Sequence, residues 1–137
     1  LDISNGGGLD DPTEEEIRSR TQEAVAAIDP ASGLEPTPTL LLAAIARASA
    51  GVPIVGVNGI FTPEAAGAAI EAGIADLVAT GRAILADPRW AQKALGRDEQ
   101  PIEPCRRCEP RCHWFADPPK CPARRRLARR GEQAPVT

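Results

Sequence analysis

Two short apolar runs separated by one helical segment constrain the fold of this chain most strongly. Residues 52–57 read VPIVGV and residues 75–80 read ADLVAT. Each run is continuously apolar at its centre rather than alternating, which is typical of parallel strands covered on both faces. The segment between them begins Thr62-Pro63-Glu64, continues through alanines and ends at Gly73, which predicts a crossover helix. The sequence therefore predicts a strand–helix–strand unit and an α/β fold.

Further helices are expected on both sides of this unit. Thr13, followed by Glu16 three residues later, forms a capping-box pattern and predicts a helix that runs to Ile28. We expect this helix to be a plain surface addition; the alternative is that it shapes a substrate entrance. Thr37-Pro38 predicts the start of another helix, which stops near Gly51. The remaining expected elements are a strand end at residues 1–4, a glycine-rich loop at residues 5–8, and short helices at residues 83–86 and 89–95.

The order of these elements indicates repeated βα units, of which only a few are visible. A closed (β/α)8 barrel takes about 250 residues, whereas this chain has 137. We therefore expect the C-terminal part of a TIM barrel in residues 1–100 and a short cysteine-rich, basic extension in residues 101–137. Because the chain opens on Leu1 within a strand pattern, we expect earlier barrel strands to precede it.

Composition excludes several classes of function. No apolar run approaches the roughly 18 residues of a membrane span, and no secretory signal pattern opens the chain. The expected protein is therefore cytoplasmic, with no membrane partner. The segment from residue 106 to 130 is strongly basic, but its two aromatic residues, Trp114 and Phe115, are adjacent rather than interleaved with the basic residues, and it has no groove-reading motif. We expect a small-molecule substrate and no nucleic acid partner.

Glycines follow both predicted strands. Asn58-Gly59 comes after the first strand and Gly81-Arg82 after the second. Glycines at the carboxyl ends of neighbouring parallel strands let main-chain N–H groups approach a phosphate, and an arginine adds a charged fork. We therefore predict that Asn58, Gly59, Gly81 and Arg82 bind the phosphate of a flavin or nucleotide cofactor. The alternative is that both glycines are ordinary turn residues and that Arg82 is a surface charge.

The same part of the chain resembles a known family. Residues 52–96, VPIVGVNGIFTPEAAGAAIEAGIADLVATGRAILADPRWAQKALG, resemble the C-terminal barrel segment of the old yellow enzyme family of flavin-dependent oxidoreductases. The ordered run ADLVATGRAILADPRW is the most specific part. The resemblance implies a TIM barrel that binds FMN through the loops containing Gly59 and Gly81-Arg82. It also implies hydride transfer from NAD(P)H through FMN to an activated C=C bond, such as an enone or enoyl thioester. Asn58 stands where the family commonly has glycine.

No catalytic residue is predicted in this chain. The family's substrate-orienting His and Asn or His pair and its proton-donating Tyr belong to earlier strands. The chain has no tyrosine, and its one histidine, His113, lies outside the barrel pattern. We therefore expect the chain by itself to be inactive.

The four cysteines, Cys105, Cys108, Cys112 and Cys121, follow the pattern C-x2-C-x3-C-x8-C. Thiols clustered in this way in a chain without secretory signals favour a metal over disulfides, and four thiolates suit a 4Fe–4S cluster or a tetrahedral zinc. Free thiols are the third alternative. One family branch, similar to 2,4-dienoyl-CoA reductase and trimethylamine dehydrogenase, has such cysteines after its barrel. That resemblance implies a 4Fe–4S centre that passes electrons to FMN, although the last gap is shorter here.

Two other functions remain open at this point. One is a non-redox phosphate-binding barrel, such as a lyase or isomerase, that uses the same two loops. The other is a non-enzymatic zinc-binding module attached to a barrel fragment. The sequence specifies neither the substrate, nor the choice between NADH and NADPH, nor the oligomeric state.

Overall fold

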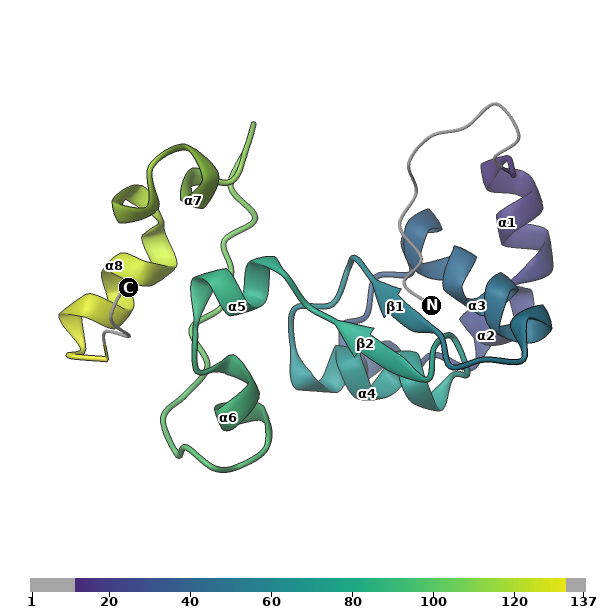
Figure 1. Ribbon diagram of the computed structural model, residues 1–137, viewed down its shortest axis with the longest axis horizontal. Coiled ribbons are helices and arrows are strands. Elements are labelled where there is room, and N and C mark those ends of the chain that lie inside the picture. Colours follow the sequence, from purple (N-terminus) through teal and green to yellow (C-terminus); the bar gives the residue numbers. More distant parts are fainter. Residues whose placement is uncertain (1–11, 133–137) are drawn as a thin grey trace. The chain divides into compact units, whose positions relative to one another are not determined.

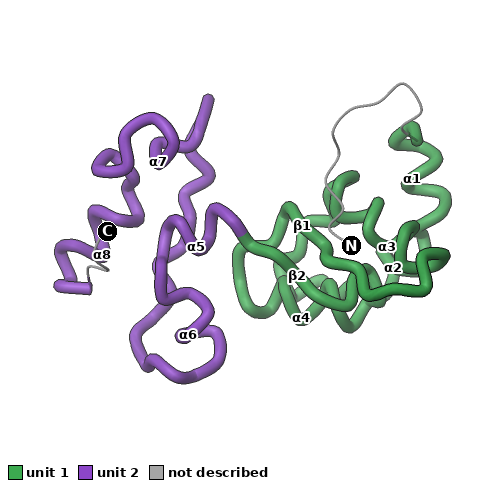
Figure 2. The backbone as a smooth tube through the Cα atoms, viewed as in Figure 1, with its two compact units in different colours: residues 1–80 green, residues 81–137 purple. Residues whose placement is uncertain are grey.

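The computed structural model describes residues 12–132, and the chain divides into two compact units, residues 1–80 and 81–137 (Figure 2). The strand end expected at residues 1–4 and the glycine loop expected at residues 5–8 lie outside the described residues. Over residues 12–132, every helix is too short or too polar to cross a bilayer.

A capping box begins the first helix, and a side-chain hydrogen bond separates it from the second. Thr13 accepts a hydrogen bond from the Glu16 N–H, and the Glu16 carboxylate accepts one from the Thr13 N–H, which confirms the capping box at α1, Glu14–Arg20. The single helix expected to run to Ile28 is wrong. The Thr21 hydroxyl donates to the carbonyl of Ile17 at 2.7 Å, and this back-bonding interrupts the helix. The chain resumes as α2, Gln22–Ala26, followed by the 3-10 turn η1, Pro30–Ser32.

The next two helices confirm the Thr-Pro signals. In α3, Pro38–Ala50, the Thr37 hydroxyl accepts a hydrogen bond from the Leu40 N–H. In α4, Pro63–Glu71, Thr62 caps in the same way. Proline at the first helical position is favoured because its missing N–H has no partner there in any case.

The two strands form a parallel pair with α4 as the crossover (Figure 1). Strand β1 spans Val55–Val57 and β2 spans Leu77–Ala79, with Val55 opposite Leu77. The strand–helix–strand prediction is therefore confirmed. The expected coverage of both strands on both faces is wrong for β2, because Leu77 is 56% exposed. The described sheet has only these two strands, so little of the described chain is available to cover β2.

The core of the first unit lies between the helices and the sheet. Its fully buried members include Leu40 from α3 and Ile74, which precedes β2. Ile17 from α1 is 4% exposed and belongs to the same core cluster. The acidic first helix is therefore an integral part of this core, and the prediction of a plain surface addition is wrong.

The second unit is built from short helices. They are α5 (Arg82–Ala86), α6 (Trp90–Ala94), α7 (His113–Ala116), the 3-10 turn η2 (Pro118–Lys120) and α8 (Pro122–Arg129). The helices expected at residues 83–86 and 89–95 are present with nearly the expected bounds. Residues 81–100 fall in the same compact unit as the cysteine-rich segment. The division of the chain at residue 100 into barrel and extension stays a prediction.

Candidate functional site

The loop after β1 contains two consecutive residues in the left-handed region. Asn58 has φ 78° and Gly59 has φ 75°. A Cβ on Gly59 would lie 2.7 Å from the carbonyl oxygen of Glu35, which is closer than real Cβ atoms approach. The Gly59 N–H donates to Oδ1 of Asn58 at 2.9 Å. Backbone geometry and packing therefore require glycine at this position, and the Gly59 amide already has an acceptor.

The carboxyl end of β2 lies beside this loop. The Thr80 hydroxyl donates to the carbonyl oxygen of Ile60 at 3.0 Å, so the chain that leaves β2 is tied to the chain that leaves β1. In a barrel, this end of the strands carries the ligand-binding loops.

Gly81 differs from Gly59 both in its backbone conformation and in its packing. It has φ −93° and ψ −74°, a conformation open to any residue. Among the described residues, no heavy atom beyond its chain neighbours lies within 4 Å of a Cβ added there. Neither conformation nor packing in the described chain explains the missing side chain, and the space fits close approach of a ligand to the backbone. Arg82, the first residue of α5, is exposed.

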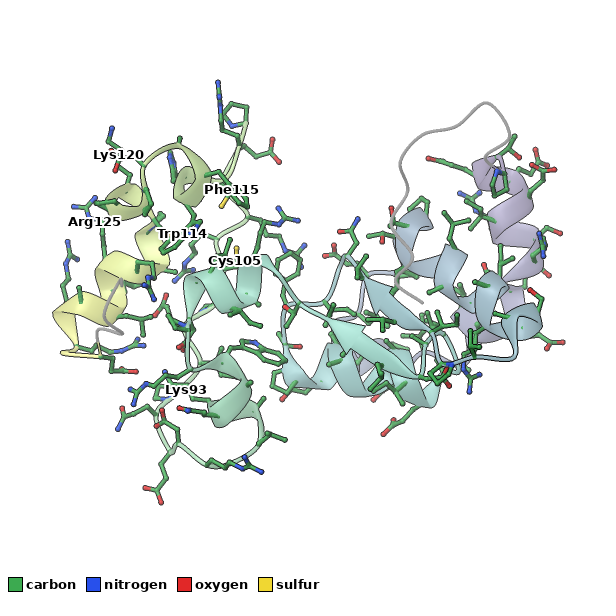
Figure 3. The ribbon with its side chains drawn as sticks, in the orientation of Figure 1. Lys93, Cys105, Trp114, Phe115, Lys120 and Arg125 are labelled. Atoms are coloured by element: carbon green, nitrogen blue, oxygen red, sulfur yellow. The ribbon has the colours of Figure 1, made fainter. Side chains whose placement is uncertain are left out.

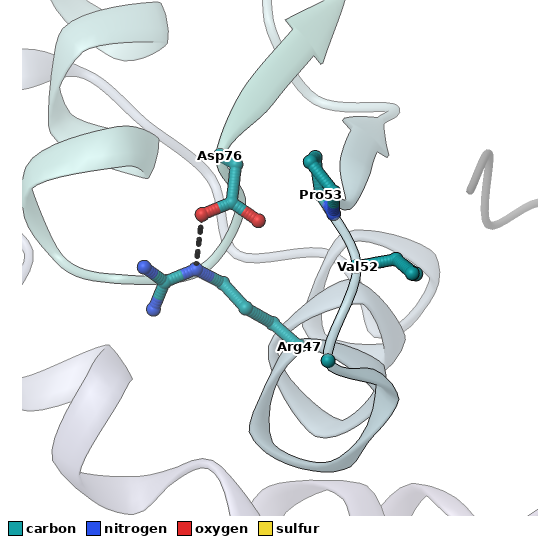
Figure 4. A pocket seen from close by; sticks show the side chains of 5 residues that line it. Arg47, Val52, Pro53 and Asp76 are labelled. Atoms are coloured by element: carbon teal, nitrogen blue, oxygen red, sulfur yellow. Dashed lines mark hydrogen bonds and ion pairs between the residues drawn. The ribbon is translucent and has the colours of Figure 1, made fainter.

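A shallow hollow lies at the opposite end of the strands (Figure 4). Arg47, Gly51, Val52, Pro53 and Asp76 line it. Asp76 accepts hydrogen bonds from the Ile54 N–H and from Nε of Arg47, both at 2.9 Å. The Ile54 N–H, followed by Arg47, holds the pKa of Asp76 below its usual value. The two carboxylate oxygens of Asp76 thus hold the start of β1 against α3. Residues at this end of a barrel typically contribute to stability rather than to catalysis.

The cysteines are only partly brought together. Cys121 is buried in a small cluster with Ala86 and Ala123, and Cys105 packs against that cluster together with Trp114 (Figure 3). All four thiols are free, and the two middle ones, Cys108 and Cys112, lie on the intervening segment. Within residues 12–132, no three Cys, His, Asp or Glu side chains are grouped closely enough to hold a metal ion. The donor set suits a thiophilic metal, but the four-cysteine site stays a prediction.

A buried ion-pair network is the feature that sequence reasoning missed. The Lys93 side chain is 1% exposed, and its ammonium lies 2.8 Å from both Oδ2 of Asp87 and Oε2 of Glu132. It also donates to the carbonyl oxygen of Pro101 at 3.1 Å. The Glu132 carboxylate further accepts from Arg130 at 2.6 Å. These groups come from the turn before α6, from α6 itself, from the loop after it, and from the residues just beyond α8.

Glu103 extends the network toward the cysteines. Its side chain is 3% exposed and accepts hydrogen bonds from Nε of Arg126 and, at 2.9 Å, from Arg130. The backbone N–H of Glu103 donates to Oδ2 of Asp87 at 2.9 Å. Residues 126 and 130 are four apart, on one face of a helix, and that spacing was the available sequence signal. Part of the basic segment is therefore a structural component of the second unit.

The network lowers the pKa of two carboxyl groups. Hydrogen bonds from Lys93 and Arg130 outweigh burial and lower the pKa of Glu132 from 4.5 to about 2. Burial alone would raise the pKa of Asp87, but hydrogen bonds from Lys93 and from the N–H groups of Glu103 and Arg89 lower it. Conversely, burial would lower the pKa of Lys93, but its two carboxylate partners raise it.

These shifts predict acid destabilisation of the second unit. A carboxyl whose pKa is lower in the folded state stabilises the fold above its unfolded pKa and loses that contribution as the pH falls through the folded pKa. We expect the urea midpoint to fall as the pH is lowered from 4.5 to about 2, because in this window the Glu132 carboxyl is protonated in the unfolded chain but still ionised in the folded one. Both tryptophans, Trp90 and Trp114, lie in this unit, so their fluorescence follows it selectively. A midpoint unchanged down to pH 2 would contradict the assignment of these pKa shifts.

Comparison with known families decides the wider identity. Residues 10–100 match the model of the NADH:flavin oxidoreductase / NADH oxidase family. The chain belongs to this family. The match confirms the resemblance to the old yellow enzyme family drawn from residues 52–96. Members of this flavin oxidoreductase family have a TIM-barrel fold, and the parallel β1–α4–β2 unit is consistent with part of such a barrel.

Curated proteins similar to this flavin oxidoreductase chain are reductases and an oxidase. A bilirubin reductase of Mediterraneibacter gnavus is 36% identical over 66 residues, which cover 48% of this chain and 10% of the relative. A metal reductase of Desulforamulus reducens is 32% identical over the same length, with the same coverage. An NADH oxidase of Thermoanaerobacter brockii is 39% identical over 61 residues, 44% of this chain and 9% of the relative. The matched segment thus spans about a tenth of each relative, and no solved structure matches the chain.

Proposed function

We propose that this chain is the C-terminal part of the FMN-binding barrel of an NAD(P)H-dependent oxidoreductase. Membership of the NADH:flavin oxidoreductase family supports the redox class. The observation that carries the proposal within the chain is Gly81, a glycine that neither conformation nor packing among the described residues requires. When bound, FMN supplies hydride-transfer chemistry, with NAD(P)H as donor and an electron-poor alkene, such as an enone or enoyl thioester, as acceptor.

The residues of this chain are assigned to holding the cofactor. Gly81 leaves room beside the backbone for the FMN phosphate, and Arg82 supplies positive charge. Asn58 and Gly59 shape the loop after β1. The Gly59 N–H is available to the phosphate only when the Asn58 side chain, its present acceptor at 2.9 Å, turns away.

The activity is tested on an intact protein that contains this chain. Anaerobic oxidation of NADH or NADPH coupled to reduction of an enone is the expected result. A colourless protein that converts a phosphorylated substrate without a flavin would instead establish the non-redox barrel alternative.

A glycine substitution tests the phosphate site. Gly81→Ala should weaken FMN binding by about tenfold, because the added methyl group occupies the space assigned to the phosphate; overpacking of this kind costs about 1–3 kcal/mol. Riboflavin, which lacks the phosphate, should bind equally to both proteins. Both affinities are measured by fluorescence titration of the flavin-free intact protein.

Gly67→Ala provides the matched control. Gly67 lies within α4, and a Cβ there also meets no described heavy atom within 4 Å. This variant should bind FMN as the wild type does. Equal loss of FMN and riboflavin affinity in Gly81→Ala would argue against a phosphate contact at this position.

We further propose that the four cysteines form a four-thiolate centre of the 4Fe–4S type, as in the 2,4-dienoyl-CoA reductase-like branch. The spacing of the cysteines and the packing of Cys105 against the cluster around Cys121 support this assignment. Iron and inorganic sulfide in the purified intact protein are the expected result. Zinc without iron would favour the zinc-module alternative and remove the electron relay.

A further inference from the structure

Ion pairs join the two ends of the segment that carries all four cysteines. Glu103 lies two residues before Cys105, and α8 begins directly after Cys121. Arg126 and Arg130, at the far end of α8, both bind the Glu103 carboxylate. The two ends of the cysteine-bearing segment are therefore joined through one buried side chain, which is 3% exposed.

A second set of contacts fixes the two ends of this segment to the preceding helices. Oδ2 of Asp87 accepts both from the Glu103 N–H at 2.9 Å and from Lys93 at 2.8 Å. Lys93 also binds Glu132, which lies just beyond α8. Glu103 thus binds Asp87, Glu132 binds Lys93, and the ion pair between Asp87 and Lys93 links these two contacts.

The network is selective among the arginines of α8. Arg125 and Arg129 are exposed and take no part in these ion pairs, whereas Arg126 binds Glu103. The Glu103 carboxylate is buried and needs cationic partners in a particular geometry, because an unpaired buried charge is strongly unfavourable. The network therefore holds one arrangement of α8 against the residues before Cys105.

We propose that Glu103, clasped by Arg126 and Arg130, is a positioning residue that presets the thiols of Cys105 and Cys121 for a shared metal. This inference rests on the proposed four-thiolate centre. With the ion pairs formed, Cys121 is buried and Cys105 packs against the same cluster. Cys108 and Cys112 then complete the centre by movement of the segment between the two preset thiols. Metal binding displaces one proton from each thiol that becomes a ligand.

The test uses the intact protein that contains this chain, reduced and freed of metal, and has two readouts. The first is the alkylation rate of each cysteine by iodoacetamide, resolved by peptide mass spectrometry. The second is Co²⁺ affinity, followed by the thiolate-to-cobalt charge-transfer absorption. Glu103→Ala should raise the alkylation rates of Cys105 and Cys121 and weaken Co²⁺ binding by about tenfold or more, as expected for loss of a residue that orients ligands. The rates of Cys108 and Cys112 should change little.

Matched variants separate positioning from a general loss of charge or stability. Glu99→Ala and Arg125→Ala remove exposed charges outside the network and should leave both readouts as in the wild type. The double variant Arg126→Ala/Arg130→Ala removes the cationic partners of Glu103 and should change both readouts as Glu103→Ala does. Arg126→Lys/Arg130→Lys restores the cations and should recover part of the Co²⁺ affinity. If Glu103→Ala loses helical circular dichroism, both readouts are measured on Arg130→Ala instead. That variant keeps the ion pair between Arg126 and Glu103.

The possible outcomes are distinct. Unchanged alkylation of Cys105 and Cys121 in both the Glu103 and the double arginine variants would overturn the positioning role. Uniform acceleration at all four cysteines would also overturn it, because that pattern indicates unfolding of the whole segment. A wild-type chain without thiolate-bound Co²⁺ would refute the four-thiolate centre, while the alkylation rates would still decide whether the two thiols are preset.

Discussion

Replacing Lys93 with methionine lowers the free energy of unfolding of residues 81–137 by about 3–5 kcal/mol, the range for removing one partner of a buried ion pair. Methionine retains an apolar side chain of similar length but leaves Asp87 and Glu132 without the ammonium that lies 2.8 Å from each. The carbonyl of Pro101 also loses its donor. Urea unfolding followed by tryptophan fluorescence measures the change, since both tryptophans lie in this unit.

Lys120→Met is the control for this measurement. Lys120 also forms an ion pair, with Asp117 at 3.1 Å, but its side chain is 71% exposed. An exposed pair of this kind contributes about 0–1 kcal/mol, so this variant should unfold close to the wild type. If Lys93→Met and Lys120→Met were equally stable, the buried network would not be a main stabilising feature of the unit.

Replacing Gly59 with alanine is expected to cause the largest loss of stability in the first unit. The substitution forces a side chain into a residue with φ 75° and places its Cβ 2.7 Å from the carbonyl oxygen of Glu35. Backbone strain alone costs about 1–3 kcal/mol, and the contact with main-chain atoms adds to it. Hydrogen exchange at the amides of β1 and β2 measures the loss, because this unit contains no tryptophan.

Two further glycines make the measurement a graded series. Gly51 has φ 63°, and a Cβ there meets no described atom within 4 Å, so Gly51→Ala carries strain without a clash. A side chain at Gly67 meets neither backbone strain nor a clash, so Gly67→Ala should stabilise α4 by about 0.5–1 kcal/mol. The expected order of stability is therefore Gly67→Ala, wild type, Gly51→Ala and Gly59→Ala. Equal destabilisation by the Gly51 and Gly59 variants would show that the Glu35 contact contributes nothing.

Sequence reasoning predicted well those features whose cause is local. Thr37 and Thr62 each precede a proline and cap the helix expected of them, because the cap depends on residues only three positions away. The parallel pairing of β1 and β2 followed from the apolar character of both strands and the length of the helix between them. The family resemblance rested on an ordered series of such local motifs, and the family match confirms it.

Features that depend on distant residues were missed. The pairing of Lys93 with Glu132 spans 39 positions, and that of Glu103 with Arg130 spans 27, so no local spacing announces them. The exposure of Leu77 depends on which chain covers the sheet, which its own apolar neighbours do not specify. At the predicted phosphate site, the sequence singled out Gly59 and Gly81 for the same reason. Only the structure separates a glycine required by backbone geometry from one that leaves open space.

The absorption spectrum of an intact protein that contains this chain tests the central proposal most directly. We expect the flavin band in the blue, bleached by NADH or NADPH under anaerobic conditions, with FMN rather than riboflavin or FAD released on denaturation. A purified protein that shows no flavin band, and acquires none when FMN is added, would contradict the assignment of residues 10–100 to a cofactor-binding barrel.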